Sequence, residues 1–323
     1  MTQRRPTANG VSEAAKRLAG IVTQTPLLPL DWRGRRLWVK AECLQQGGSF
    51  KLRGASNRLA LLGEAERRRG VVAFSSGNHA QGVARAARAL GISATIVMPA
   101  DAPAVKVEGT RAAGATIVFF DRATESREEI GARLAAEQGA TLVPSFDDVD
   151  VIEGQGSVGV EIAEQLGDDP PFVLVPCGGG GLSSGIALAL PGSCTMVVEP
   201  EGWDDMGRSL ALGHIVPVVE PAPPTRCDAL QTKLVSPLTF GTLQMVGATA
   251  LAVSEAEVAA AMLFAFRELR IVAEPGGAVA LAALLAGKAG DVPEGSVVVV
   301  SGGNVDWAVY AEVLETAATS RVS

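Results

Sequence analysis

Short runs of β-branched and aliphatic residues alternate with longer helical patterns over most of the chain. The strand-like runs cover residues 70–75, 94–99, 115–120, 140–145, 172–176 and 195–200, and a helical pattern follows each of them. Strands without a polar face are buried on both sides, which is typical of parallel sheets covered by helices. The alternation therefore predicts an α/β fold with parallel-rich sheets.

The four strand–helix units between about residues 70 and 147 are enough for one compact sheet. The segments that follow, with a last strand-like run at 296–301, can form a second sheet. We therefore expect two domains with a cleft between them. A small α/β domain comprises residues 61–147, and a large domain comprises residues 1–60 and 148–323.

Composition excludes several classes of protein. The chain has 323 residues, 47% of them hydrophobic, and a net charge of -7. The only dense basic run is "AERRRG" at 65–70, which we interpret as the solvated end of a helix, so we expect no nucleic-acid partner. The four cysteines form no C-x-x-C pair and only two histidines are present, which argues against a zinc site.

The N-terminal residues contain no apolar signal region. The longest apolar run, at 278–287, is too short to span a bilayer. We therefore expect a cytoplasmic protein that does not associate with membranes.

Four consecutive glycines, Gly178 to Gly181, stand between a buried strand and a helical pattern. Glycines leave backbone N–H groups accessible, and N–H groups at a helix N-terminus favour an anion. The loop therefore predicts a phosphate site. A dinucleotide is one candidate, with Glu199 at a suitable distance for a ribose contact, but Ser183 or Ser184 stands where the G-x-G-x-x-G pattern needs its third glycine.

Lys51 lies in the segment "GGSFKLRGA" (47–55), between Phe50 and Leu52. A dinucleotide site would leave this lysine without a role. Burial lowers the pKa of a lysine, and the free amine can form a Schiff base with an aldehyde. A half-buried lysine together with a phosphate cradle therefore indicates pyridoxal phosphate as the cofactor.

Four segments in this order resemble the serine/threonine dehydratase (threonine ammonia-lyase) and serine racemase family. They are "SFKLRGA" (49–55), "SSGNHAQGVA" (75–84), "CGGGGLSSG" (177–185) and "SGGN" (301–304). The resemblance runs from about residue 15 to about residue 315 and includes "VAEPGGAVALAALL" (272–285). It implies a fold type II pyridoxal-phosphate enzyme with the two-domain architecture of the tryptophan synthase β type, whose large domain binds the cofactor.

The resemblance also implies roles for individual residues. Lys51 is expected to hold the cofactor covalently, with Phe50 beside the ring. Asn78 is expected to contact the ring hydroxyl, and Ser301 the pyridine nitrogen. The phosphate is expected to bind the loop formed by Gly178, Gly179, Gly180, Gly181 and Leu182.

The substrate carboxylate is expected to bind a loop at a helix N-terminus, formed by Ser75, Ser76, Gly77, Asn78 and His79. For His79, packing at the helix start is an alternative to direct contact. Ser76 matches the acid/base position of the racemases in this family. Racemisation is therefore an alternative activity, although a serine that only hydrogen-bonds within the loop also fits the position.

The reaction implied by the resemblance is dehydration and deamination of a β-hydroxy amino acid. The freed amine of Lys51 removes the α-proton, the β-hydroxyl leaves, and a 2-oxo acid and ammonia are released. A hydroxyl at Ser301 cannot enforce a protonated ring as a carboxylate would, which disfavours transamination. L-Threonine and L-serine are the expected substrates, with serine or threonine racemisation and 3-hydroxyaspartate dehydration as alternatives. Arg127 could meet a second carboxylate, or form a salt bridge on a helix surface.

Glu199 and Asp205 match the divalent-cation site of the family, with the carbonyl of Trp203 between them. Two carboxylates and a carbonyl suit Mg²⁺ or Ca²⁺. The segment Cys227-Asp228-Ala229 departs from the Ala-Asp-Gly common in the family, near the substrate end of the pocket, so it leaves the substrate open. The chain ends about twenty residues after "SGGN", without a regulatory extension, which favours a catabolic enzyme.

We further expect a homodimer that acts on a small amino acid. Outside this enzyme class, a nucleotide-binding dehydrogenase and a non-catalytic metabolite sensor on the same fold are the alternatives.

Overall fold

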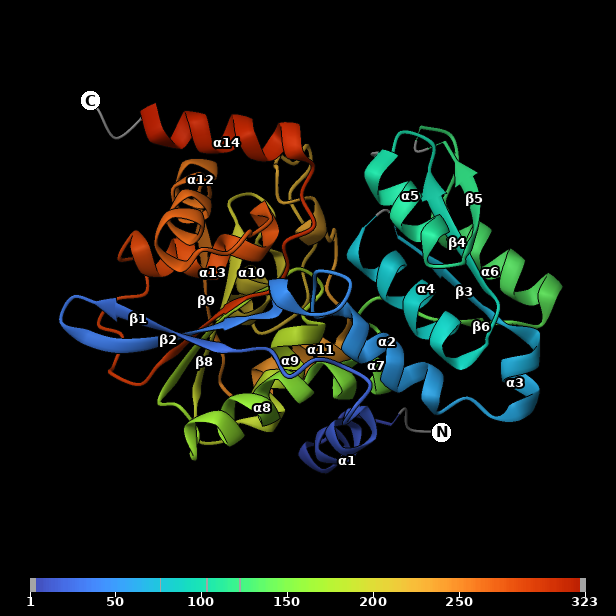
Figure 1. The fold of residues 1–323 in the computed structure, drawn as a ribbon, viewed down its shortest axis with the longest axis horizontal. Coiled ribbons are helices and arrows are strands. Elements are labelled where there is room, and N and C mark those ends of the chain that lie inside the picture. Colours follow the sequence, from blue (N-terminus) through green and yellow to red (C-terminus); the bar gives the residue numbers. More distant parts are fainter. Residues whose placement is uncertain (1–3, 76, 103, 122, 320–323) are drawn as a thin grey trace.

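The computed structural model describes residues 4–75, 77–102, 104–121 and 123–319. Two sheets form the centres of two lobes, shown side by side in Figure 1. The six-stranded sheet has the order β1 (Leu27–Trp32), β2 (Arg35–Ala41), β10 (Val297–Val300), β7 (Phe172–Pro176), β8 (Cys194–Pro200) and β9 (Thr249–Val253). Only β1 pairs antiparallel, with β2, and the other neighbours are parallel.

The four-stranded sheet is parallel throughout and has the order β5 (Thr116–Phe120), β4 (Ala94–Pro99), β3 (Val71–Phe74) and β6 (Thr141–Leu142). Its helices are α3 (Glu64–Arg69), α4 (Asn78–Leu90), α5 (Ala104–Ala112) and α6 (Arg127–Gln138). The basic run at 65–70 is the end of α3, and its three arginines stand in the last turn, as the sequence predicts. The strand-like run at 140–145 shortens to two paired residues.

Helices around the six-stranded sheet are α1 (Ala8–Leu18), α8 (Ser157–Leu166), α9 (Gly181–Ala189), α10 (Asp205–Leu212), α11 (Pro237–Met245), α12 (Glu255–Phe264), α13 (Pro275–Leu285) and α14 (Trp307–Thr319). Two 3₁₀ turns (Glu42–Leu44 and Asp228–Leu230) and a π-helical turn (Ala265–Leu269) complete the elements of this lobe. Nearly all of α13 is buried in the main core, as its apolar sequence requires.

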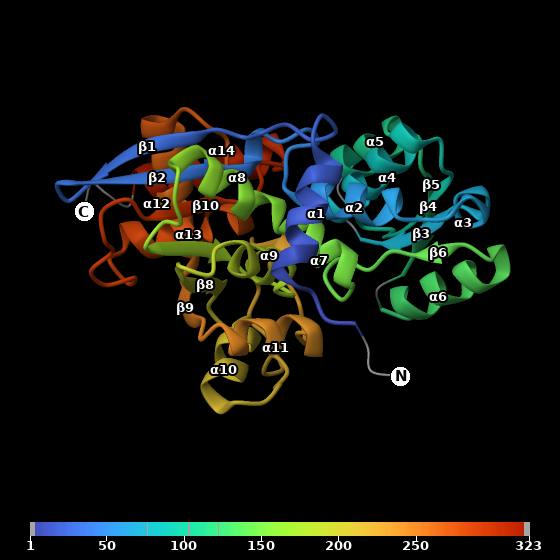
Figure 2. The same ribbon diagram turned by 90° about the horizontal axis from the view of Figure 1, so that it is seen from below.

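Helices α2 (Lys51–Ala60) and α7 (Val149–Gln155) lie between the lobes (Figures 1 and 2). Leu52, Ala55 and Leu59 of α2 and Val151 of α7 belong to the same core as β3, β4 and α4. The parallel-rich α/β fold is therefore confirmed. The boundaries of the two predicted domains stay a prediction.

The helical pattern at 151–167 is interrupted at Gly156, where α7 ends and α8 begins. A Cβ atom at Gly156 would lie 2.7 Å from the carbonyl oxygen of Gly185 on α9. The close approach of these backbones explains the glycine and the break. Among the described residues, every helix is too short or too polar to cross a lipid bilayer.

Candidate functional site

A cavity of about 490 Å³ lies between the two lobes. The loops after β3 and β6 and helices α5 and α6 form one side, and the segment 228–234 and the start of α13 form the other. Lys51 and much of the predicted substrate loop line it, whereas Phe50, the tetraglycine loop and Ser301 are not among the lining residues.

Lys51 is the first residue of α2, and its ammonium faces the cavity. Its Nζ donates a hydrogen bond to the carbonyl oxygen of Ser145 at 3.0 Å and lies 5.1 Å from the centre of the Phe50 ring. Burial of the ammonium lowers the pKa of Lys51 to about 8, against a smaller opposing effect of Glu274. A minor fraction of this amine is therefore already unprotonated near neutral pH.

The start of α2 is fastened to the end of the central strand β10. The amide of Phe50 donates to the carbonyl oxygen of Ser301 at 3.2 Å, and Ser49 pairs with Gly302. The hydroxyl of Ser301 has no hydrogen-bond partner within the described chain. The fold thus brings Phe50, Lys51 and Ser301 together, with one hydroxyl left for a ligand.

The tetraglycine loop precedes α9, and Gly180 has a left-handed backbone with φ +83°. A Cβ atom at Gly179 would lie 2.2 Å from the ring of Phe146, which explains the absence of a side chain. Within the described residues, the amides of Gly178, Gly179, Gly181 and Leu182 donate to no other protein group. Free amides at a helix N-terminus are the donors that a phosphate needs, so this loop fits the phosphate of pyridoxal phosphate.

The predicted substrate loop leads into α4. The hydroxyl of Ser75 accepts the amide of Gly77 at 3.1 Å, and Ser76 lies outside the described residues. The side chain of Asn78 donates to Glu274 at 2.5 Å and accepts from Asn304 at 2.8 Å. Asn78 therefore links the two lobes across the cavity.

His79 is buried, and its Nε2 lies 2.9 Å from the carbonyl oxygen of Val143. A carbonyl only accepts, so Nε2 carries the proton and donates. The Nδ1 atom is buried and without a partner among the described residues. Burial and the nearby Lys51 lower the pKa of His79 to about 3, so the ring is neutral and offers no charge to a carboxylate.

Glu274 received no role from the sequence. It precedes Pro275 at the start of α13, is buried, and lines the cavity. Burial raises the pKa of Glu274 to about 8, and Asp228 adds to the effect. Its position as the only acid in the apolar segment 272–285 was the available signal.

Lys106 on α5 is a second residue of the cavity without a role in the sequence analysis. It forms an ion pair with Asp228, the residue that follows Cys227 in the segment that departs from the family. Arg127, the predicted partner of a second carboxylate, also lines the cavity. Arg127 hydrogen-bonds to Glu128 at 2.8 Å and lies 5.7 Å from the Phe74 ring centre, so the helix-surface alternative describes its present contacts.

Glu199, Trp203 and Asp205 lie together at the start of α10, at the carboxyl end of β8. Glu199 is buried and accepts the amides of Met206 and Gly207 at 3.0 and 2.8 Å. The indole of Trp203 donates to Pro223 at 2.8 Å.

Neither carboxyl oxygen of Asp205 has a partner among the described residues. Burial raises the pKa of Asp205 to about 7, and the nearby amides of Asp205 and Val235 offset only part of this. No group of three or more His, Cys, Asp or Glu residues suited to a metal occurs in the described chain. Asp205 nevertheless fits one ligand of a hard cation that is completed by carbonyl and water oxygens.

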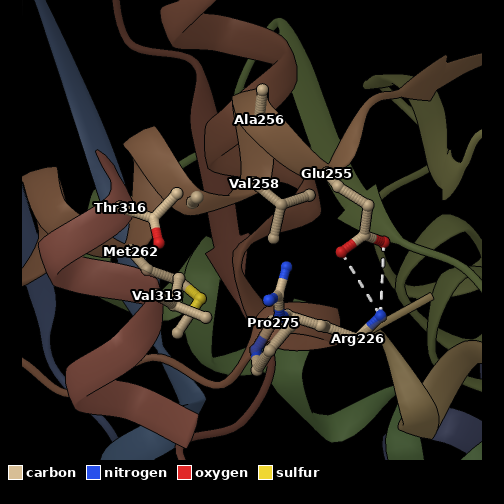
Figure 3. Close-up of a pocket in the computed structure, with 9 residues that line it drawn as sticks. Arg226, Glu255, Ala256, Val258, Met262, Pro275, Val313 and Thr316 are labelled. Atoms are coloured by element: carbon tan, nitrogen blue, oxygen red, sulfur yellow. Dashed lines mark hydrogen bonds between the residues drawn. The ribbon is translucent and has the colours of Figure 1, made fainter. Parts of the chain in front are cut away.

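A smaller cavity of about 180 Å³ lies away from these residues, between α12, α14 and the start of α13 (Figure 3). The backbone amide of Arg226 donates to both carboxyl oxygens of Glu255 at 3.3 Å, and its guanidinium pairs with Glu312. The other residues that line this cavity are largely apolar. The two charged residues of this lining, Arg226 and Glu255, thus already have protein partners.

Known proteins share this fold and much of this sequence. A protein-family model described as "Pyridoxal-phosphate dependent enzyme" matches residues 18–303. An L-threo-3-hydroxyaspartate ammonia-lyase of a Pseudomonas species is 46% identical over 314 residues, which cover 94% of this chain and 97% of that relative. An L-threonine ammonia-lyase of Thermotoga maritima is 40% identical over 308 residues, which cover 93% of this chain and 76% of that relative.

The solved structure of maize serine racemase has a TM-score of 0.90 and 34% identity, and covers 99% of this chain and 100% of that one. The family match spans most of the chain, from before Lys51 to Gly303 in the "SGGN" segment. By fold, by sequence and by a lysine-lined cavity beside a free-amide loop, this chain belongs to the family of pyridoxal-phosphate dependent enzymes.

Proposed function

We propose that this protein is a pyridoxal-phosphate dependent ammonia-lyase that converts a β-hydroxy amino acid to a 2-oxo acid and ammonia. The observation that best supports this proposal is the amine of Lys51. Its pKa is lowered to about 8 in a cavity next to the free amides of the tetraglycine loop. An amine with this pKa can act as a base at neutral pH.

Pyridoxal phosphate, when bound, withdraws electrons from the α-carbon of the substrate. The protein then has to bind, orient and move one proton. Lys51 anchors the cofactor and takes the α-proton, and the amides of Gly178 to Leu182 bind the phosphate. The hydroxyl of Ser301 accepts or donates at the pyridine nitrogen, and the 75–79 loop binds the substrate carboxylate through N–H groups.

The sequence motifs favour L-threonine and L-serine as substrates, with 3-hydroxyaspartate as an alternative. We now favour 3-hydroxyaspartate. The hydroxyaspartate ammonia-lyase relative is 46% identical to this chain, against 40% for the threonine ammonia-lyase. In addition, Lys106 and Arg127 line the cavity, and a second carboxylate needs a cation.

A screen of 2-oxo acid release tests the proposal. The holoenzyme is incubated with L-serine, L-threonine and the threo and erythro isomers of 3-hydroxyaspartate, and the remaining amino acid is analysed for racemisation. We expect oxaloacetate from a hydroxyaspartate isomer as the fastest product. Absence of a 2-oxo acid from all of them would contradict the ammonia-lyase, and faster turnover of threonine would contradict the choice of substrate.

We also propose that Glu199, Asp205 and the carbonyl of Trp203 bind Mg²⁺ or Ca²⁺. The support is the pair of unpartnered carboxyl oxygens on the buried Asp205. Added cation should raise the melting temperature of the wild type but not of Asp205→Ala, because a bound ion stabilises only the folded state. If chelator and cation leave the wild-type melting temperature unchanged, the site is wrong.

The expected homodimer stays a proposal as well. Leu44, Phe266, Val272 and Trp307 are large apolar residues that expose 44–78% of their surface. Phe266 packs on Tyr310, which follows Trp307 by one turn of α14, so Phe266 and Trp307 lie near each other. A Cβ atom at Gly303 would touch both Val272 and Cys43, the neighbour of Leu44, so Val272 and Leu44 also lie near each other. We propose that a second copy covers this face, and light scattering after size exclusion measures the mass.

A further inference from the structure

We propose that Lys106 determines the specificity for a dicarboxylic substrate by binding its second carboxylate. This inference rests on the proposed function, because it assigns a residue to the side chain of 3-hydroxyaspartate. The observations that carry it are the burial of Lys106 in the wall of the cavity and its position beside the 75–79 loop.

Lys106 is placed next to the loop that binds the first carboxylate. A Cβ atom added to Gly77 would lie 3.9 Å from the Nζ atom of Lys106. The two carboxylates of 3-hydroxyaspartate are separated by only two carbon atoms. A substrate held at the 75–79 loop by one carboxylate therefore carries the other toward the neighbouring ammonium.

The ammonium of Lys106 has unused hydrogen-bonding capacity. Lysine has three N–H donors, and within the described chain Asp228 is the only acceptor for Lys106. Lys106 is 8% exposed, so the cavity is the main source of further acceptors. Asp228 holds the ammonium in place, because one of its carboxyl oxygens accepts one N–H and leaves two donors for a ligand.

Apart from Lys51, which we propose as the cofactor anchor, the other cations of the cavity are less suited to this role. Arg127 and Lys233 have side-chain exposures of 44% and 74%, and each already pairs with an acid, Glu128 and Glu220. Exposed ion pairs contribute little to binding, because water competes for both partners. Burial thus separates Lys106 from its two neighbours of like charge.

The enzyme should discriminate against serine and threonine because these substrates leave N–H donors of Lys106 without an acceptor. Serine has a hydrogen atom, and threonine a methyl group, where 3-hydroxyaspartate has its second carboxylate. A hydrogen bond to a charged group is worth about 1.5–3 kcal/mol, which corresponds to roughly 10- to 150-fold in specificity. Lys106→Met should therefore lower the ratio of kcat/KM for 3-hydroxyaspartate over that for serine by this factor.

The variant is expected to fold, since it removes the partner of an acid that is itself 45% exposed. Lys106→Arg should restore most of the ratio because it keeps the charge. Lys233→Met is the matched control that removes a cation from the same cavity, and the ratio should stay within about threefold. A Lys106→Met variant that slows all substrates equally would overturn the inference, as would a larger loss of the ratio in Arg127→Met.

A binding measurement separates this inference from the proposed function. Succinate, with two carboxylates two carbons apart, and butyrate, with one, are titrated into the wild-type and Lys106→Met holoenzymes by calorimetry. We expect Lys106→Met to weaken succinate roughly 10-fold or more and to leave butyrate unchanged. If no β-hydroxy amino acid is turned over but this difference is found, the proposed function fails and the carboxylate site at Lys106 stands. Equal effects on both ligands would overturn the site itself.

Discussion

Two of the three basic residues of helix α2, Lys51 and Arg53, belong to two different clusters of charged and polar side chains. Arg53 belongs to the structural cluster, which consists of Lys40, Glu42, Arg53 and Glu161. Lys51 belongs to the cavity cluster, which we define as Lys51, Asn78, Lys106, Asp228 and Glu274.

The structural cluster has two cations and two anions, and its hydrogen bonds are complete. Every nitrogen of the Arg53 guanidinium donates, with bonds of 2.8 Å from Nε and Nη2 to Glu42 and of 2.5 Å from Nη1 to Glu161. Lys40 donates to Glu161, to Gln165 and to the carbonyl oxygen of Thr25. Burial alone would lower the pKa of Arg53, but Glu42 and Glu161 outweigh it and raise the pKa.

The cavity cluster is incompletely paired. The pKa of Lys51 falls to about 8, and that of Glu274 rises to about 8. Both groups can therefore change their protonation near neutral pH, whereas the raised pKa keeps the Arg53 guanidinium charged. One helix thus combines a fixed ionic anchor, Arg53, with a reactive amine, Lys51, two residues away.

The largest effect is expected from Lys51→Ala. Turnover of the holoenzyme should fall by at least about a thousandfold, because the variant lacks both the anchor and the base. The melting temperature of the cofactor-free protein should change little, since the ammonium donates only to Ser145 among the described residues. The measurement is 2-oxo acid release together with a thermal melt. Turnover at a comparable rate would contradict the role of Lys51.

Arg53→Met should have the reverse pattern and tests the other cluster. It leaves Glu42 and Glu161 buried without their main partner, and breaking a buried ion pair costs about 3–5 kcal/mol in the free energy of unfolding. Arg36→Met is the control, because its ion pair with Asp31 is exposed and worth at most about 1 kcal/mol. Urea denaturation measures both. Equal losses in the two variants would remove the distinction between the clusters.

Glu274→Gln tests the cavity cluster through the pH dependence of protein stability. Burial raises the pKa of Glu274 from 4.5 to about 8 in the folded protein. The folded state therefore binds a proton more tightly than the unfolded state, and the resulting stability is present below about pH 4.5 and lost as pH rises through 8.

The cofactor-free wild type should lose roughly 2–4 kcal/mol more than Glu274→Gln between pH 5 and pH 8.5. The glutamine side chain of the variant is isosteric with glutamate and keeps an oxygen for the amide of Asn78. Denaturation of both proteins at the two pH values gives the difference. Parallel pH profiles would show that Glu274 is not protonated in the folded state.

Local structure was largely predictable from the sequence. The strands β3, β4, β7, β8 and β10 lie within one or two residues of the predicted runs, because β-branched residues without a polar face have few alternatives. The antiparallel hairpin β1–β2 was not indicated, since its residues include Pro29 and several charged residues that interrupt an apolar pattern. The break at Gly156 depends on the approach of α9, which no local pattern contains.

The residues of the candidate site were likewise only partly predictable from the sequence. Lys51, the tetraglycine loop and Ser301 lie in motifs whose residue types indicate what each of them binds. Glu274 and Lys106 were missed because their roles come from contacts with Asn78 and Asp228, which are 196 and 122 residues away in the chain. A single sequence gives no signal for such pairings.

The smallest effect is expected at Ser301, the neutral group behind the cavity cluster. Its amide donates to the carbonyl oxygen of Gly277, and its carbonyl oxygen accepts the amide of Phe50. Its hydroxyl bonds to no described residue. Ser301→Ala should therefore keep the stability of the cofactor-free protein. It should weaken pyridoxal phosphate by about 2- to 12-fold in Kd, the equivalent of one hydrogen bond of about 0.5–1.5 kcal/mol.

Ser296→Ala is the matched control, because Ser296 stands just before the same strand and its hydroxyl already donates to the carbonyl oxygen of Pro293 at 2.7 Å. It should lower the free energy of unfolding by about 1 kcal/mol and leave the cofactor Kd unchanged. Absorbance titration with pyridoxal phosphate and urea denaturation measure the two quantities for both variants. If Ser301→Ala behaves like Ser296→Ala, the hydroxyl of Ser301 supports the fold, and the cavity cluster reaches the cofactor without it.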